Sequence, residues 1–336
     1  MKNKIFNSII VIVSACIFLS FFFFTKGLNT FIEELKTLNK LWLILSLILM
    51  ILFWFFETIC LYIITKTFHK TNNLFTKSLK FEMIGQFFGA VTPFSAGSHP
   101  AQLYAMIESE IPAGIAGSIL MIKFIIHQAV NIIILILAFL FKFNYFNSRV
   151  NYFIYLCVSG LIVHIIIMIF AILFSINSRL TKRFLIFIFK VLKKFKIIKN
   201  IESSYKKIEI ELENFHKNAA LITKNIKMCI YASILTFLQW IAFFTIPYCI
   251  YRSFGFNSAD ILTMITAQIF LINFMAIIPL PGAEGGAEGG FYLIYSLFFN
   301  SDIIITAIFL WRVITYYSSI AVGSIFSLST QTKEKN

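Results

Sequence analysis

The stretch IIPLPGAEGGAEGGFYLIY, residues Ile277–Tyr295, places two prolines, five glycines and two glutamates between apolar segments. Within a membrane, irregular backbone occurs only where it is buried in protein or lines a cavity. Ionisable side chains at that depth usually mark functional sites. The stretch therefore predicts a broken, re-entrant segment that carries a site. The alternative is an ordinary Gly/Pro loop between two helices at the membrane surface.

The composition indicates a membrane protein. Of 336 residues, 59% are hydrophobic and 13% are charged, and the mean hydropathy is +0.85. Forty-one phenylalanines and repeated apolar runs of about twenty residues are typical of a polytopic helical membrane protein. The longest stretch able to leave the bilayer, Ser178–Lys227, is too short to form an enzyme domain of its own.

The apolar runs predict an all-α polytopic membrane protein with about eight transmembrane helices and two Pro/Gly-broken re-entrant segments. The helix-like runs are, in chain order, Ile5–Phe24, Leu41–Ile64, Phe75–Thr92, Ala113–Phe141, Tyr152–Ile176, Met228–Tyr251, Asp260–Ile278 and Ile303–Leu328. The broken segments are Thr92–Pro112 and Ile277–Tyr295. The whole chain, residues 1–336, is expected to form one integral membrane domain.

The basic residues predict the topology. Two lysines precede Ile5–Phe24, which lacks a signal-peptide cleavage pattern and is expected to be a retained helix with a cytoplasmic N-terminus. Ser178–Lys227 holds thirteen of the 29 basic residues, and its apolar positions recur every three or four residues on either side of Asn200. We expect two amphipathic helices on the cytoplasmic membrane surface. A docking surface for a partner is the alternative, and the lysine-bearing C-terminus is also expected to be cytoplasmic.

An internal repeat is visible at an offset of 186 residues. This shift lays Leu41–Ile64 on Met228–Tyr251, and Phe88–Gln102 on Phe274–Glu288. The repeated units would be residues 41–141 and 228–328, separated by the basic insert of 178–227. If the two broken segments each complete a crossing, counting the basic loops makes the two units run in opposite directions through the membrane. Inverted repeats whose broken helices meet near the bilayer midplane are the architecture of many secondary transporters.

The broken segments are candidate binding sites for an anion. A helix that restarts after a break presents unpaired N–H groups and a positive dipole end, which suit a phosphate or carboxylate. The candidate substrate-binding residues in the first segment are Pro93, Ser95, Gly97, Ser98, His99 and Gln102, and those in the second are Pro281, Gly282, Gly285, Gly286 and Gly289. Alternatively, the glycines only let helices pack closely.

Charged residues near these segments complete the candidate site. Glu284 and Glu288 would share one helix face and would need a cation, for which Arg312 is the internal candidate. Lys123 and His127 form a second polar pair four residues apart. For Lys123 and Arg312 the alternative is snorkelling toward lipid headgroups. Two further carboxylates, at positions 57 and 82, are compatible with loop positions and have weaker cases.

Other chemistry finds little support in the sequence. The five cysteines show no C-x-x-C spacing, and no two histidines form a metalloprotease-type pair, so no metal or cofactor is expected. Walker A, G-x-S-x-G and H-E-x-x-H sequences are all absent. The net charge of +14 indicates topology and contact with anionic lipid headgroups, and nucleic acid is not expected as a partner.

Two motifs, TPFSAGSHPAQLYAM at 92–106 and PLPGAEGGAEGGFYLIY at 279–295, carry a family resemblance. With them the chain resembles the transmembrane, flippase-like region of bacterial lysylphosphatidylglycerol synthases, the multiple peptide resistance factor (MprF) family, in its free-standing form. The resemblance implies a multi-pass protein of the bacterial cell membrane that moves an aminoacylated phosphatidylglycerol, or a related phospholipid, between leaflets. Lysyl-lipid displayed outside contributes to resistance against cationic antimicrobial peptides.

An enzymatic role is the alternative function. In full-length members of the resembled family a further cytoplasmic domain transfers lysine from lysyl-tRNA to the lipid, and this sequence stops at Asn336 without that domain. Lysyltransferase activity is therefore not expected from the chain itself, although it could be the membrane subunit of a phosphatidylglycerol lysyltransferase. The expected partners are the bilayer and a membrane phospholipid. A homo-oligomer and a separate synthase partner are both compatible with the sequence.

Overall fold

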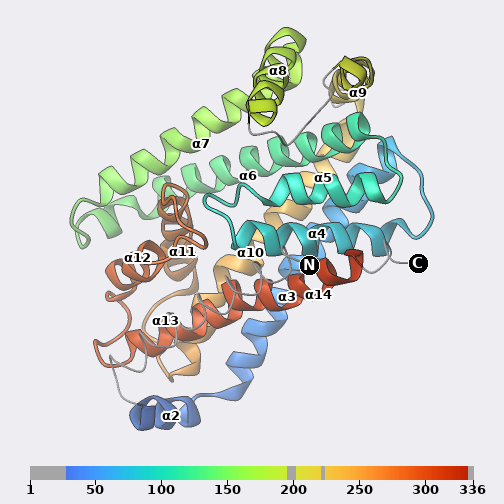
Figure 1. Ribbon diagram of the computed structural model, residues 1–336. Coiled ribbons are helices and arrows are strands. Elements are labelled where there is room, and N and C mark those ends of the chain that lie inside the picture. Colours follow the sequence, from blue (N-terminus) through green and yellow to red (C-terminus); the bar gives the residue numbers. More distant parts are fainter. Residues whose placement is uncertain (1–27, 195–201, 221–223, 332–336) are drawn as a thin grey trace.

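The computed structural model describes residues 28–194, 202–220 and 224–331, and this part of the chain is helical without any named strand. The predicted helix Ile5–Phe24 lies outside the described residues. The helices are α2 (Leu28–Thr37), α3 (Lys40–Phe68), α4 (Leu74–Ala90), α5 (Ser98–Glu108), α6 (Ala113–Asn147), α7 (Phe153–Ile176), α8 (Ser178–Lys194), α9 (Glu202–Ala220), α10 (Ile226–Ser253), α11 (Ile261–Met275), α12 (Gly286–Tyr295), α13 (Ile304–Arg312), the π-helical segment η2 (Val313–Tyr317) and α14 (Ser318–Gln331) (Figure 1). The predicted all-α polytopic class is confirmed.

Five of the described helical stretches are long and apolar enough to cross a membrane: α3, α6, α7, α10 and the continuous run Ile304–Leu328. Their outward faces are apolar as well; Ile162, Ile169 and Phe170 of α7, for example, are about half exposed or more. Such faces suit contact with lipid chains. The two shorter predicted runs, Phe75–Thr92 and Asp260–Ile278, differ from simple spans because each is the first arm of a helical hairpin.

Each hairpin folds back at its Pro/Gly break. In the first, Gly89 of α4 faces Ser98 of α5, and Gly85 faces Gln102, so the arms are antiparallel. In the second, the hydroxyl of Tyr295 on α12 donates to Gln268 Oε1 on α11 at 2.9 Å. The glycines allow the arms to approach closely. Both ends of a hairpin therefore lie toward the same end of the bundle, as expected for re-entrant segments.

The two halves of the chain run in opposite directions. Asn39 N, at the start of α3, donates to Ser253 O at the end of α10 over 2.9 Å. Near the other ends, Cys60 Sγ lies 3.8 Å from Ala232 O. The long helices α3 and α10 are thus antiparallel along their whole contact (Figure 1). The first unit, α3–α6, and the second unit, α10–α14, repeat the same order of long helix, hairpin and long helix in the inverted sense.

The hairpin tips meet between the units. Pro93 and Pro281 form an isolated antiparallel bridge. Each hairpin also packs its first arm on the last long helix of the other unit, α4 on α14 and α11 on α6. Two contacts show the match: a Cβ added to Gly323 would lie 2.5 Å from Met83 O, and the rings of Phe139 and Phe270 lie 5.5 Å apart. The two breaks are therefore close neighbours in space.

The basic insert forms a helical pair at one end of the bundle. The predicted amphipathic helices are α8 and α9, although the expected break near Asn200 lies outside the described residues. Lys182 Nζ donates to Glu209 Oε1 at 2.7 Å, which lowers the pKa of that carboxyl. Glu211 Oε2 accepts from Gly114 N at the start of α6. The pair thus covers the end where α6 begins, opposite α2 (Figure 1). Its cytoplasmic placement stays a prediction.

Gly282→Ala is expected to lower the free energy of unfolding by about 1–3 kcal/mol. Gly282 has φ +58°, and an added Cβ would lie 2.3 Å from Tyr316 Cε2, so both the backbone and the neighbouring ring oppose a side chain. Thermal unfolding of detergent-solubilised protein would measure the loss. Gly289→Ala is the matched control, because Gly289 lies within α12 and nothing stands within 4 Å of its added Cβ. Equal melting temperatures for Gly282→Ala and wild type would contradict the assignment of a tight hairpin tip.

Candidate functional site

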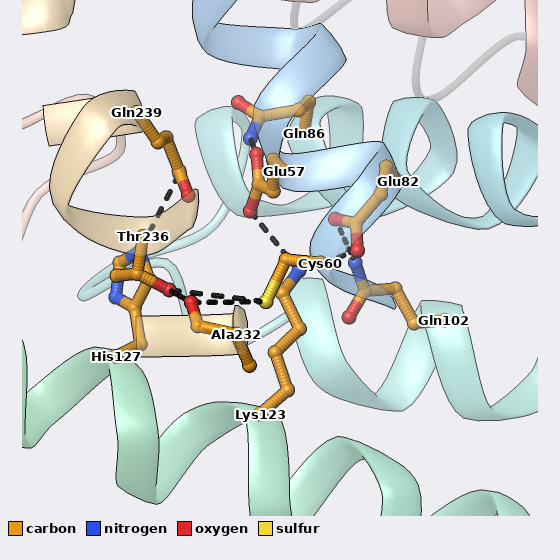
Figure 2. A network of polar contacts seen from close by, with 10 residues as sticks. All are labelled: Glu57, Cys60, Glu82, Gln86, Gln102, Lys123, His127, Ala232, Thr236 and Gln239. Carbon is orange, nitrogen blue, oxygen red and sulfur yellow. Dashed lines mark hydrogen bonds and ion pairs between the residues drawn. The ribbon is translucent and has the colours of Figure 1, made fainter. Parts of the chain in front are cut away.

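The first unit buries a cluster of charges, the lysine triad, made of Glu57, Glu82 and Lys123. Lys123 Nζ lies 3.1 Å from Glu57 Oε1 and 2.5 Å from Glu82 Oε1. The side chains of Lys123, Glu57 and Glu82 are 5%, 11% and 0% exposed. Figure 2 shows the lysine reaching between the two carboxylates from α6. The triad joins α3, the first hairpin and α6 through one ammonium group.

Two glutamine amides complete the shell of the triad. Gln86 Nε2 donates to Glu57 Oε2 at 2.6 Å, and Gln102 Nε2 donates to Glu82 Oε2 at 2.8 Å (Figure 2). All four carboxylate oxygens therefore accept a hydrogen bond. Such satisfaction is needed because a buried carboxylate without partners is strongly destabilising. The triad still contains two carboxyl groups and only one ammonium.

The polar surroundings continue along α6. His127, one turn beyond Lys123, has its Nε2 3.4 Å from Gln239 Nε2 on α10 and its ring 5.0 Å from the ring of Trp240. One further turn along, Asn131 Nδ2 lies 3.4 Å from His164 Nε2 on α7. We call Lys123, His127 and Asn131 the α6 polar row. Successive members are four residues apart and face one side of the helix.

The second unit buries its own cation beside its hairpin. Arg312 Nε lies 2.5 Å from Glu288 Oε1, and Arg312 Nη1 donates to Gly282 O at 2.9 Å. The guanidinium also lies over the ring of Tyr316, 4.9 Å from its centroid. Arg312 Nη2 is buried and has no hydrogen-bond partner among the described residues. The residue directly precedes η2, and π-helical segments within α-helices are frequent at functional sites.

Arg312 is the cation that pairs with the second hairpin, and it pairs with only one of the two glutamates there. Arg312, expected as the internal partner, pairs with Glu288 and is 2% exposed, so it does not snorkel to the surface. Glu284 behaves differently from expectation. Helix α12 begins only at Gly286, after positive φ angles at Gly282, Ala283 and Gly285, so Glu284 lies in the turn and shares no helix face with Glu288.

The helix starts are also less open than predicted. Gly285 N donates to Glu288 Oε2 at 2.7 Å, so the glutamate expected to meet a ligand caps its own helix. In the first hairpin, Gly97 N donates to Thr92 Oγ1 at 2.8 Å and Ser98 N donates to Ser95 O. These N–H groups are therefore already bonded within the hairpins. A ligand would meet side chains before it met free backbone donors.

The remaining predicted residues have different surroundings in the structure. Gly286 serves packing, because an added Cβ would lie 2.0 Å from Ile278 Cδ1, and Pro93 and Pro281 form the tip contact. His99 packs its ring against Phe124, 5.2 Å away, close to the triad. The predicted pair of Lys123 and His127 lies on one face of α6. A Cβ added at Gly289 would have no atom within 4 Å, so this glycine is not required for close packing.

Glu57 and Glu82 lie at the centre of the first cluster, although from the sequence they were weaker candidates because loop positions were plausible for them. A usable signal was present: Glu57 interrupts an otherwise apolar run near its middle. The repeat offset supplied a second one. It pairs Glu82 with Gln268 and Gln102 with Glu288, so each hairpin carries one glutamate and one glutamine, exchanged between the arms. A carboxylate at either position is thus part of the repeated pattern.

The fold and these clusters define a class: a polytopic membrane protein with two opposed re-entrant hairpins and a buried cation beside each. The chain belongs to the family described as the lysylphosphatidylglycerol synthase transmembrane region, whose profile matches residues 8–323. This confirms the resemblance seen in the sequence. The chain is also similar to a UPF0104 membrane protein of Archaeoglobus fulgidus, with 24% identity over 324 residues that cover 94% of each chain. No solved structure matches it.

Proposed function

We propose that this protein moves a phospholipid between the two leaflets of the cell membrane, and that the lipid is an aminoacylated phosphatidylglycerol or a related anionic phospholipid. One observation carries the proposal: two hairpins inserted from opposite ends of the bundle meet at Pro93 and Pro281, with a buried cation beside each. A headgroup that crosses a bilayer needs polar groups near the midplane, whereas its acyl chains can stay in lipid. The opposed hairpins supply such groups in both halves.

Arg312 is the proposed contact for the lipid phosphate. Its Nε and Nη1 are bonded to Glu288 and Gly282 O, and the unbonded Nη2 remains as a donor that lies in the same plane. Guanidinium groups form charge-assisted hydrogen bonds to phosphate with strong directional preference. Glu284, half-buried at the tip of the second hairpin, is the proposed contact for a cationic amine on the headgroup.

The inverted units provide a route to alternating access. In transporters of this architecture, one unit or hairpin rocks against the other around a site that stays near the midplane. Here the tips touch through the proline bridge and through Tyr316, whose hydroxyl donates to Ala90 O at 3.2 Å. We place both chain termini and the α8–α9 pair on the cytoplasmic side, in keeping with their basic residues.

A headgroup-accessibility assay in reconstituted vesicles tests the proposal. Wild-type protein is expected to expose headgroup-labelled phosphatidylglycerol and lysylphosphatidylglycerol to a membrane-impermeant quencher from both leaflets. Arg312→Lys keeps the positive charge but removes Nη2 together with the fixed geometry of the other two donors. It should slow this exchange at least on the order of 10- to 100-fold, the usual worth of one hydrogen bond to a charged group.

Arg252→Lys is the matched control for that variant. Arg252 ends α10, stacks over the Trp42 ring at 4.7 Å and donates to Tyr248, away from both charge clusters. Its replacement should leave the exchange rate at the wild-type level. The proposal fails if wild-type vesicles, with protein incorporation verified, expose no more inner-leaflet lipid than empty vesicles.

A further inference from the structure

The lysine triad has an imbalance of charge. With all groups ionised, Glu57, Glu82 and Lys123 carry a net charge of −1 inside the bundle, and one bound proton makes the triad neutral. Among the described residues, the other titratable groups that interact with the triad are His99 from α5, His127 from α6 and Cys60 from α3. None of these is a permanent cation. Since net charge is costly at this depth, the triad is suited to exchange a proton.

A protonated Glu82 would need a new hydrogen-bond acceptor, and the side-chain amide of Gln102 can supply one. Gln102 donates its Nε2 to the carboxylate, while its buried Oε1 lies near His99 and makes no hydrogen bond of standard geometry with any described residue. Rotating the amide by half a turn exchanges these two atoms and presents Oε1 to the carboxylic O–H. Both protonation states of Glu82 can therefore be satisfied by the same glutamine.

The same arrangement recurs at two histidines, His127 in the α6 polar row and His164 on α7, which faces the row. Gln239 directs its Nε2 to His127, and within the described part of the chain its buried Oε1 has no hydrogen-bond partner. Asn131 directs its Nδ2 to His164 Nε2 and to Asn273 Oδ1, each at 3.4 Å, and leaves its Oδ1 in the same condition. Each amide can thus face either an acceptor nitrogen or an N–H group of its histidine. Three titratable groups are each paired with an amide that suits both of their states.

These pairs lie in sequence along the membrane-crossing direction. From Lys123 to Asn131 the α6 polar row covers eight residues, or about 12 Å of helix. His164 is bonded in turn to Gln128 Oε1 at 2.9 Å, on the α7 side of α6. The row therefore extends from the first hairpin toward α7 and α11 through the middle of a helix long enough to span the bilayer.

We propose that the lysine triad binds and releases a proton, that His127 and His164 relay it along α6, and that this proton movement drives the lipid transport. The proton comes from water on one side, forms the O–H bond of the Glu82 carboxylic acid, and returns to water on the other side. No electron moves and no other reactant is consumed. The driving role rests on the proposed lipid transport, whereas proton binding by the triad does not.

The test uses vesicles that hold the full chain, headgroup-labelled phosphatidylglycerol and an internal pH dye. An imposed gradient of one pH unit should shift the equilibrium ratio of labelled lipid between leaflets about tenfold if one proton moves per lipid. Addition of lipid to one leaflet should also change the internal pH. In Glu82→Gln the triad is neutral without a proton, so the leaflet ratio should no longer respond to the gradient.

Two variants secure the interpretation. Glu209→Gln removes an exposed carboxylate on α9 and should keep the full response. His127→Gln interrupts the relay without touching either ion pair, and should abolish the response even where Glu82→Gln does not yield folded protein. A gradient response retained by His127→Gln and Glu82→Gln would overturn the proton proposal. So would a response to a sodium gradient in place of the pH gradient.

The outcomes separate this inference from the proposed function. Lipid exchange by wild-type protein that ignores the pH gradient overturns the proton coupling and leaves the lipid transport standing. Absence of any exchange overturns the lipid transport. In that case a gradient-driven proton flux, measured with the same dye in wild type and lost in His127→Gln, would still support proton transfer through the triad. An internal pH that does not change in wild type would overturn that transfer.

Discussion

Lys123→Met is expected to destabilise the protein by about 3–5 kcal/mol, the usual cost of removing one partner from a buried ion pair. The change leaves Glu57 and Glu82 facing each other with side chains that are 11% and 0% exposed and no cation between them. Most of the expressed chain should then fail to fold. The fraction recovered as monodisperse protein and its thermal unfolding would measure the effect.

Neutralising the partners should reverse that loss. The triple variant Lys123→Met, Glu57→Gln, Glu82→Gln contains no buried charge in the triad and should regain most of the lost stability, because replacing all members of a buried ionic cluster is often nearly neutral. Lys142→Met is the control, since Lys142 contacts the mostly exposed Asp260 at 3.7 Å and should cost about 1 kcal/mol or less. Wild-type stability in Lys123→Met alone would contradict the buried triad.

Arg312→Met is expected to be nearly as damaging, at about 3 kcal/mol or more. It removes the partner of Glu288 and the donor to Gly282 O, so both the charge balance and the tip of the second hairpin are lost. A double-mutant cycle with Glu288→Gln should show a coupling of about 1–3 kcal/mol between the two side chains. Chemical or thermal unfolding in detergent gives the required free energies.

The control for this cycle is the exposed pair of Lys217 and Glu213, four residues apart on α9. Its coupling should be about 0.5 kcal/mol or less, because exposed pairs on a helix surface are weak. If the Arg312–Glu288 coupling were no larger than that of the exposed pair, the second charge cluster would not hold the hairpin together. The arginine would then be free to act on a ligand alone.

The fold was largely predictable because bilayer thickness limits helix length. Leu41–Ile64 and Met228–Tyr251 became α3 and α10 with ends that differ by a few residues. The repeat offset also located both hairpins, since it aligned the two clusters of proline and glycine at which the helices end. The short α2 was not predicted, because it lacks a long apolar run and is positioned by a contact between Glu34 and Thr306 of α13.

The site was only partly predictable, because its contacts join residues far apart in the chain. Arg312 could be matched to Glu288 since both stood out in apolar surroundings within one unit. The lysine triad joins positions 41 and 66 residues apart, which no local pattern reveals. The capping of α12 by Glu288 depends on positive φ at Gly285, a backbone detail that follows only from the folded hairpin.

The proline bridge between the hairpins has a consequence for how the two halves separate. Neither Pro93 nor Pro281 has a backbone N–H, so an antiparallel bridge between them can be closed only by the amides of the residues that follow, Phe94 and Gly282. A longer seam between the hairpins would present a row of such amides, each costly to expose where water is absent. A bridge of one residue pair limits this cost to two donors, so separating the hairpin tips would interrupt a single rung and no extended ladder.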